Sequence, residues 1–96
     1  MQRRRTPLEV LEATGATTII LYLYEAGEVP VSRIPEETRI PRSTVYNTLQ
    51  VLLEAGLISE HREEKVFPRR RLIFLTEKGR KVAELLREIE RILGDV

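Results

Sequence analysis

The sequence contains no cysteine and no tryptophan, and its single histidine is His61. The lack of cysteine excludes disulfide bonds, thiolate chemistry and cysteine metal sites. His61 has no second histidine or cysteine with which to share a metal ion, so we expect no metal site and no cofactor. Gly-rich phosphate loops, nucleophile elbows and metal-binding helix motifs are also missing. These absences argue against an enzyme.

Long apolar runs are scarce as well. The longest uninterrupted run, residues 19–24, is far too short to cross a membrane. The N-terminus is basic and lacks the apolar stretch of a signal peptide, so we expect a cytoplasmic protein without membrane contact. The 96 residues predict one domain, residues 6–96, preceded by a basic N-terminal arm at residues 1–5. The net charge of only +1 argues against a generally cationic surface.

The stretch 41–56 presents two different faces when it is placed on a helix. Its apolar residues form one inward stripe: Val45, Leu49, Leu52 and Leu53. A second stripe at helical spacing is polar but neutral: Ser43, Tyr46, Asn47 and Gln50. Solvated helix faces elsewhere in the chain carry Arg and Glu instead. Uncharged donors and acceptors suit the base edges of a DNA major groove, and an ordinary solvated surface is the alternative.

The two kinds of polar residue on this helix, about residues 41–55, suit different parts of DNA. Asn47 and Gln50 match adenine edges, whereas Tyr46 and Ser43 match phosphate or a thymine methyl group. The start of the helix favours phosphate, because its first N–H groups are free. The candidate DNA-binding residues of the recognition helix are therefore Arg42, Ser43, Thr44, Tyr46, Asn47 and Gln50.

Two helices are expected in the N-terminal part of the domain. Thr6 can cap a short helix that runs to about Thr14, with Glu9 completing a capping box. Residues 16–26 favour a strand by propensity, but their length and flanking glycines predict a helix. Because this helix is apolar all round, we expect it to be covered on more than one side.

A short helix and a turn are predicted directly before the recognition helix. Residues 28–31 have room for a short strand, and Ser32 can cap a helix at residues 33–38. Pro41 pushes Ile40 out of helical geometry and suits the start of the next helix. Two helices joined by such a short turn form a helix-turn-helix arrangement.

A β-hairpin, the wing, is predicted at about residues 57–75. Two β-type runs, residues 57–62 and 72–75, flank a charged stretch that contains Pro68. Glu63 and Glu64 partly neutralise this stretch, and alternation along a strand would turn one of its three consecutive arginines to the opposite face. A solvated hairpin is the alternative to DNA contact. The candidate DNA-binding residues of the wing are Arg62, Lys65, Arg69, Arg70 and Arg71.

Thr76 predicts the cap of a final helix, about residues 76–94, whose apolar residues follow the spacing of a coiled-coil seam. This stripe is longer than packing on one domain requires, and the apolar helix at 16–26 also has surface to spare. We therefore expect a homodimer whose interface contains Ile19, Tyr22, Leu23, Val82, Leu85, Leu86, Ile89, Ile92 and Leu93. A small-molecule effector would have to sit at this interface near Tyr22 or Tyr24, and no set of residues identifies one.

Three blocks of sequence resemble the winged helix-turn-helix of bacterial and archaeal transcriptional regulators, in particular the MarR-like and PadR-like groups. They are residues 42–49 (RSTVYNTL), 53–58 (LEAGLI) and 75–80 (LTEKGR), in the order and spacing of that motif. The resemblance implies a mainly α fold with a small β-hairpin wing, here with dimerisation helices at both ends. It also implies a homodimer on a roughly palindromic operator, with the recognition helix in the major groove and the wing on an adjacent minor groove or the backbone.

Two residues depart from the pattern of the motif. Arg39 stands where glycine is common, and Pro41 stands where a Ser or Thr cap is usual. Either the turn avoids a positive φ or Arg39 accepts some strain. The arm arginines, Arg3 to Arg5, either enter a minor groove or form a solubilising tail.

These patterns together predict a transcriptional regulator that is nucleoid-associated and binds double-stranded DNA sequence-specifically as a homodimer. Two alternatives remain open. A winged helix can serve as a protein-interaction module, which the near-zero net charge favours. It can also serve as an architectural DNA-binding module without operator specificity, which the modest basic content disfavours.

Overall fold

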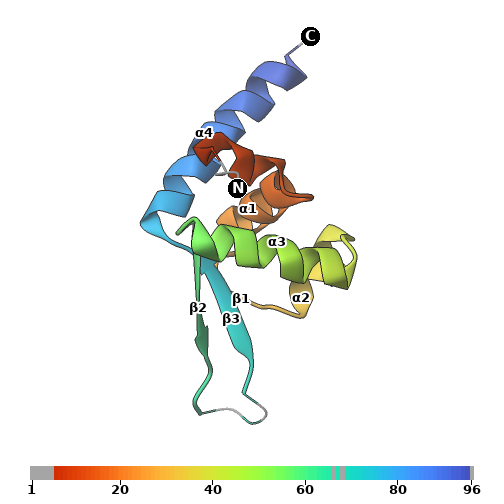
Figure 1. Cartoon of the computed structure of the whole chain (residues 1–96), viewed down its shortest axis with the longest axis vertical. Helices are drawn as coiled ribbons and strands as arrows, with labels where there is room; N and C mark the ends of the chain where they lie inside the picture. Colours follow the sequence, from red (N-terminus) through yellow and green to blue (C-terminus); the bar gives the residue numbers. More distant parts are fainter. Residues whose placement is uncertain (1–5, 66, 68, 96) are drawn as a thin grey trace, which may run out of the picture.

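The computed structural model describes residues 6–65, 67 and 69–95, so the arm at residues 1–5 lies outside the described residues. Three short strands form one antiparallel sheet in the order β1-β3-β2. The fold is mainly α with a small β wing, a winged helix-turn-helix, as the sequence predicted (Figure 1). Its elements in chain order are η1 (Pro7–Glu12), α1 (Ala16–Ala26), β1 (Val29–Pro30), α2 (Arg33–Thr38), α3 (Arg42–Glu54), β2 (Ile58–Arg62), β3 (Arg71–Leu75) and α4 (Glu77–Gly94).

Helix α1 forms the centre of the core. Its residues Ile19, Ile20 and Leu23 are fully buried, because α1 packs against η1, α2, α3, α4 and β3. The segment is a helix, as its length and flanking glycines predicted, although its β-branched residues favour strands. It is covered on more than one side, as the apolar pattern predicted.

Two predicted helix caps are wrong. The first element is a 3₁₀ helix, and the Thr6 hydroxyl makes no capping hydrogen bond. Instead, the Glu9 backbone N–H donates to the Thr6 carbonyl at 3.0 Å, the short i to i+3 bond that a 3₁₀ turn uses. Ser32 also fails as a cap, because its backbone is already helical (φ −65°, ψ −22°) and its side chain makes no capping bond.

The wing is held at its base and projects beyond the helices at its tip (Figure 1). Ile58 pairs with Leu75, and Ile73 of β3 pairs with both Glu60 and Val29. The apolar residues at this base are buried, whereas β2 becomes exposed from Glu60 onward. Strand β3 begins at Arg71, one residue earlier than predicted, and β1 adds a third strand on its other edge.

Helix α4 starts at the cap that the sequence predicted. The Thr76 hydroxyl accepts a hydrogen bond from the Gly79 N–H at 3.0 Å. Ala83 and Leu86 pack into the core, and an ion pair between Arg87 and Glu25 joins α4 to α1. The C-terminal turns of α4 then extend away from the body (Figure 1). None of the helices in the described part of the chain is long and apolar enough to span a bilayer.

Candidate nucleic-acid interface

The two stripes of α3 lie as their spacing predicted. Val45, Leu49 and Leu52 are buried in the core, and Leu53 is half-buried. The neutral polar stripe is exposed along its whole length: Ser43, Tyr46, Asn47 and Gln50. Helix α3 runs across the body beside the base of the wing (Figure 1).

A buried threonine fixes the position of α3. The Thr48 hydroxyl, only 3% exposed, donates a hydrogen bond to the Thr14 carbonyl at 2.6 Å. Thr44 and Asn47 line a small pocket against the same turn between η1 and α1. Sequence reasoning missed Thr48, because a threonine between two stripes looks like one more polar surface residue. Its signal was its helical spacing from the buried residues Val45 and Leu52.

The start of α3 has no side-chain cap. Pro41 occupies the cap position with extended backbone, and its carbonyl accepts from the Val45 N–H at 2.9 Å. No side chain therefore satisfies the N–H groups of the first turn, which carry the positive end of the helix dipole. Arg42 is exposed at this point, and Thr44 is half-buried. This arrangement suits an anion such as phosphate.

The turn between α2 and α3 adopts the strained alternative. Arg39 ends α2 with φ 62° and ψ 21°, the left-handed region that glycine prefers. The residue is exposed and stands three positions before Arg42. Sequence reasoning recognised the unusual residue type here but did not include Arg39 among the candidate DNA-binding residues.

The basic residues of the wing fall into two groups. Arg70 pairs with Glu63 at 2.5 Å, and the Arg71 Nε donates to Glu60 at 2.5 Å, so their charges are partly neutralised. The other group forms no ion pair with any residue that the structure describes and is exposed: Arg62, Lys65 and Arg69. Acidic neighbours therefore neutralise only Arg70 and Arg71 among the described basic residues of the wing.

His61 forms a hydrogen bond with the carboxylate of Glu28, in the turn before β1. Its Nε2 lies 2.5 Å from the Glu28 carboxylate, and its ring contacts Phe74 edge-on at a centroid distance of 5.7 Å. The hydrogen bond to Glu28 raises the pKa of the imidazole above 6.5. The contact connects β2 of the wing to the turn before β1.

Three of the nine residues expected at a dimer interface are buried in their own protomer. Ile19 and Leu23 are at most 1% exposed and Leu86 is 9% exposed, so their side chains offer almost no surface to a second copy. The expectation is corrected for these residues, because α4, α3 and the sheet already cover α1. Tyr22 and Val82 are half-buried. The remaining four are large, exposed and on α4: Leu85, Ile89, Ile92 and Leu93.

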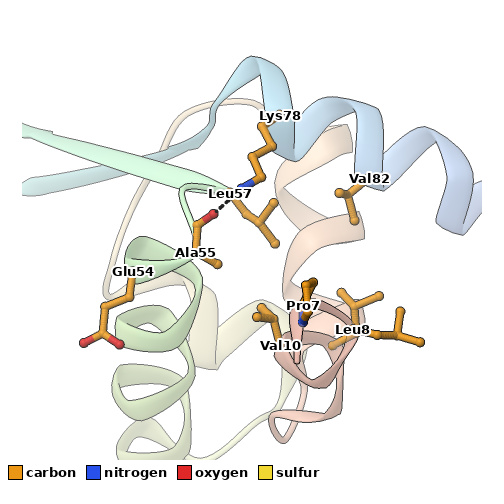
Figure 2. Close-up of a pocket in the computed structure, with 9 residues that line it drawn as sticks. Pro7, Leu8, Val10, Glu54, Ala55, Leu57, Lys78 and Val82 are labelled. Atoms are coloured by element: carbon orange, nitrogen blue, oxygen red, sulfur yellow. Dashed lines mark hydrogen bonds between the residues drawn. The ribbon is translucent and has the colours of Figure 1, made fainter. Parts of the chain in front are cut away.

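An apolar groove lies at the foot of this exposed stripe, with a volume of about 590 Å³. Figure 2 shows Pro7, Leu8 and Val10 of η1 on one side and Val82 of α4 facing them. The Lys78 ammonium closes one end by donating to the Ala55 carbonyl at 2.9 Å. Leu8 on η1 is 74% exposed, so it is more accessible to a partner than Tyr24 on α1, which is 39% exposed.

The two tyrosines considered for an effector do not share a site. Tyr22 lines a pocket with Glu37 and Arg87, and burial followed by the nearby Glu37 carboxylate raises its pKa. Tyr24 lines a different pocket with Phe74 and Arg80. Neither pocket continues into the groove between η1 and α4.

Comparison with known protein families identifies the family to which the chain belongs. Residues 18–74, from α1 to β3, match the family described as sugar-specific transcriptional regulator TrmB. The chain belongs to the TrmB family. It is therefore a transcriptional regulator and not an enzyme. The match in this TrmB-family chain leaves η1 and α4 outside its limits. No curated protein is similar enough in sequence to be matched to the chain.

Several of the solved structures that are similar to this TrmB-family chain are described as transcriptional regulators. A transcriptional regulator homologue from Pyrococcus horikoshii OT3 has 18% identity over 92% of this chain and 90% of that chain, with a TM-score of 0.77. Streptococcus pneumoniae FabT, solved in complex with DNA, has 24% identity over 86% and 61% of the two chains, with a TM-score of 0.70. Both likenesses concern the fold.

A MarR family regulator from Neisseria meningitidis has higher identity, 31%, over 83% of this chain and 56% of that chain, with a TM-score of 0.66. The TrmB-family chain thus spans less than two thirds of this regulator and of FabT.

Proposed function

We propose that the protein binds double-stranded DNA in a sequence-specific manner, with α3 in the major groove. The observation that carries this proposal is the exposed stripe of Ser43, Tyr46, Asn47 and Gln50, on a helix whose apolar stripe faces the core. Base edges in the major groove present donors and acceptors that neutral polar side chains can read. A regulator of similar fold, FabT, has been solved in complex with DNA, which supports this use of the fold.

Phosphate contacts supply the affinity in this proposal. Arg42 and the uncapped first turn of α3 face the backbone beside the major groove. The wing contributes Arg62, Lys65 and Arg69, the basic residues that have no carboxylate partner in the described part of the chain. They contact an adjacent minor groove or the backbone. Such contacts position the protein without reading sequence.

The proposal also includes a homodimer on a roughly palindromic operator. Leu85, Ile89, Ile92 and Leu93 expose an apolar stripe on α4 that leaves the body of the protomer (Figure 1). The groove between η1 and α4 continues this apolar surface at its foot (Figure 2). Burying such surface against a second copy is favourable, and two recognition helices then read two half-sites about one DNA turn apart.

Selection from a random duplex pool at two salt concentrations tests the proposal. We expect the wild type to enrich a two-fold symmetric site. Retention without enrichment would indicate an architectural protein, and no retention would indicate a protein-interaction module; either outcome contradicts the proposal.

Two variants then distinguish a residue that reads the base sequence of the selected site from a residue that contacts its phosphate backbone. Asn47→Ala should cost roughly 1–3 kcal/mol on that site and little on a scrambled duplex. Arg69→Ala should weaken both complexes equally and reduce the salt slope by about one unit per lost phosphate contact. Equal losses on both duplexes for Asn47→Ala would show that the stripe does not read sequence.

A further inference from the structure

Arg39 adopts a backbone conformation that opposes its residue type. Among the described residues, it alone has a positive φ without being a glycine. The β carbon of an L-residue is crowded in this left-handed region, so glycine would be more stable at this position. A strained residue that persists is a reason to look for a function of its side chain.

The neighbours of Arg39 impose this conformation. The Thr38 hydroxyl donates to the Ile34 carbonyl at 2.6 Å and accepts from the Ile40 N–H at 3.4 Å. The Arg39 N–H itself donates to the Pro35 carbonyl at 2.9 Å. The turn geometry is thus fixed by backbone and threonine contacts, and the Arg39 side chain plays no part in them.

Packing of Ile40 fixes the far side of the same turn. Ile40 packs against the core over Gly15, so closely that a β carbon at Gly15 would lie 2.5 Å from the Ile40 Cδ1. The turn therefore half-buries Ile40 and leaves Arg39 exposed.

The guanidinium of Arg39 is available to a ligand. Arg70, Arg71 and Arg87 pair with carboxylates, whereas Arg39 forms no ion pair with any described residue. Only Ile40 and Pro41 separate it from Arg42, which begins α3. The two arginines thus bracket the entry to the recognition helix. A guanidinium binds phosphate through two parallel hydrogen bonds.

We propose that Arg39 is a phosphate-binding residue that contacts the DNA backbone ahead of α3, in addition to the residues named above. The inference rests on the proposed DNA binding of α3. The rigid turn holds the start of the side chain in place before DNA arrives, so little backbone ordering is needed for the contact. Arg39 then lowers the folding stability of the free protein and raises the affinity for DNA.

The experiment compares Arg39→Gly and Arg39→Gln with a matched control, Arg80→Gln. Arg80 is also exposed and unpaired among the described residues, but it lines a pocket with Tyr24 and Phe74 on another part of the surface. Thermal unfolding and DNA affinity are measured for each variant, on the duplex selected by the wild type and on a scrambled duplex, from low to high salt.

We expect Arg39→Gly to raise Tm by about 2–6 °C, because it removes the crowded β carbon. Both Arg39 variants should bind each duplex about tenfold more weakly at low salt, with the salt slope reduced by about 0.9 for one lost phosphate contact. Arg80→Gln should retain the wild-type slope.

Three results would overturn the inference. Unchanged affinity and slope in both Arg39 variants would remove the contact, and an equal loss in Arg80→Gln would show a general charge effect instead. A loss confined to the selected duplex would assign Arg39 to base reading. In all three cases the wild type still binds DNA, whereas a wild type that binds no duplex would contradict the proposed function itself.

Discussion

At the scale of single residues, His61 and Glu28 form the contact with the clearest dependence on pH. The hydrogen bond between them raises the pKa of the imidazole, because the carboxylate favours the charged ring. A histidine whose pKa is higher in the folded state stabilises the fold below its unfolded pKa. This contribution is lost as the pH rises through the folded pKa, from about 6.5 upward. The connection between β2 and the turn before β1 should therefore weaken as the pH rises through the folded pKa of His61.

Glu28→Gln should lower the pKa of His61, because the amide keeps an acceptor but not the negative charge. A proton NMR titration can follow this directly, since His61 is the only histidine in the sequence. Glu64→Gln, another change to an exposed carboxylate, is the control and should leave the titration curve in place. An unchanged midpoint in Glu28→Gln would show that the carboxylate does not set the pKa.

At the scale of elements, the joint between α4 and the wing depends on one glycine. A β carbon on Gly79 would lie 1.9 Å from the Leu57 carbonyl oxygen, which already accepts from the Thr76 N–H at 3.0 Å. Gly79→Ala must separate α4 from the base of the wing, so we expect the free energy of unfolding to fall by about 3 kcal/mol or more. Urea unfolding at fixed protein concentration measures this change.

Gly94→Ala is the matched control for that prediction. It lies in the same helix, and a β carbon there would meet nothing within 4 Å. Its effect should stay within about 1 kcal/mol and can be stabilising, since alanine has the higher helix propensity. Equal stability of the two variants would mean that the close approach at Gly79 is easily relaxed.

Elements with a strong local pattern could be predicted from the sequence, and elements set by tertiary contacts could not. The two stripes of α3 and the Thr76 cap of α4 follow from spacing and cap chemistry alone. The 3₁₀ geometry of η1 and the burial of Ile19, Ile20 and Leu23 on α1 depend on which elements pack against them. The apolar run at 16–26 showed that cover was needed but not whether it would come from the same chain.

The same distinction applies to the candidate site. Exposure of the polar stripe on α3 followed from helical periodicity. The division of the wing arginines into paired and unpaired groups did not, because it depends on which side chains the hairpin brings within reach of Glu60 and Glu63. The positive φ of Arg39 was one of two alternatives, and the choice between them depends on the Thr38 hydrogen bonds and on the packing of Ile40.

At the scale of the whole molecule, the surface proposed for DNA binding and the surface proposed for dimerisation lie in different parts of the protomer. The wing projects from one end of the fold, and the C-terminal turns of α4 extend from the other (Figure 1). Association through α4 and η1 would therefore leave the polar face of α3 and the wing uncovered. One protomer reads only a few base pairs, so a regulator that finds a rare site gains most of its selectivity from a second copy.

Replacing Leu85 and Ile89 together with Glu should abolish dimer formation without unfolding the protomer. Both side chains are at least 50% exposed in the protomer, so the charges stay in water when the protein is monomeric and become costly only at a buried interface. In sedimentation at tens of micromolar, where we expect the wild type as a dimer, the double variant should appear as a monomer. Its affinity for a two-half-site duplex should fall at least tenfold, whereas its affinity for one half-site should stay unchanged.

Arg80→Glu is the control: it changes the net charge by the same amount elsewhere on α4 and should remain dimeric. A monomeric wild type, or a double variant that still dimerises, would show that the exposed stripe of α4 does not join two copies.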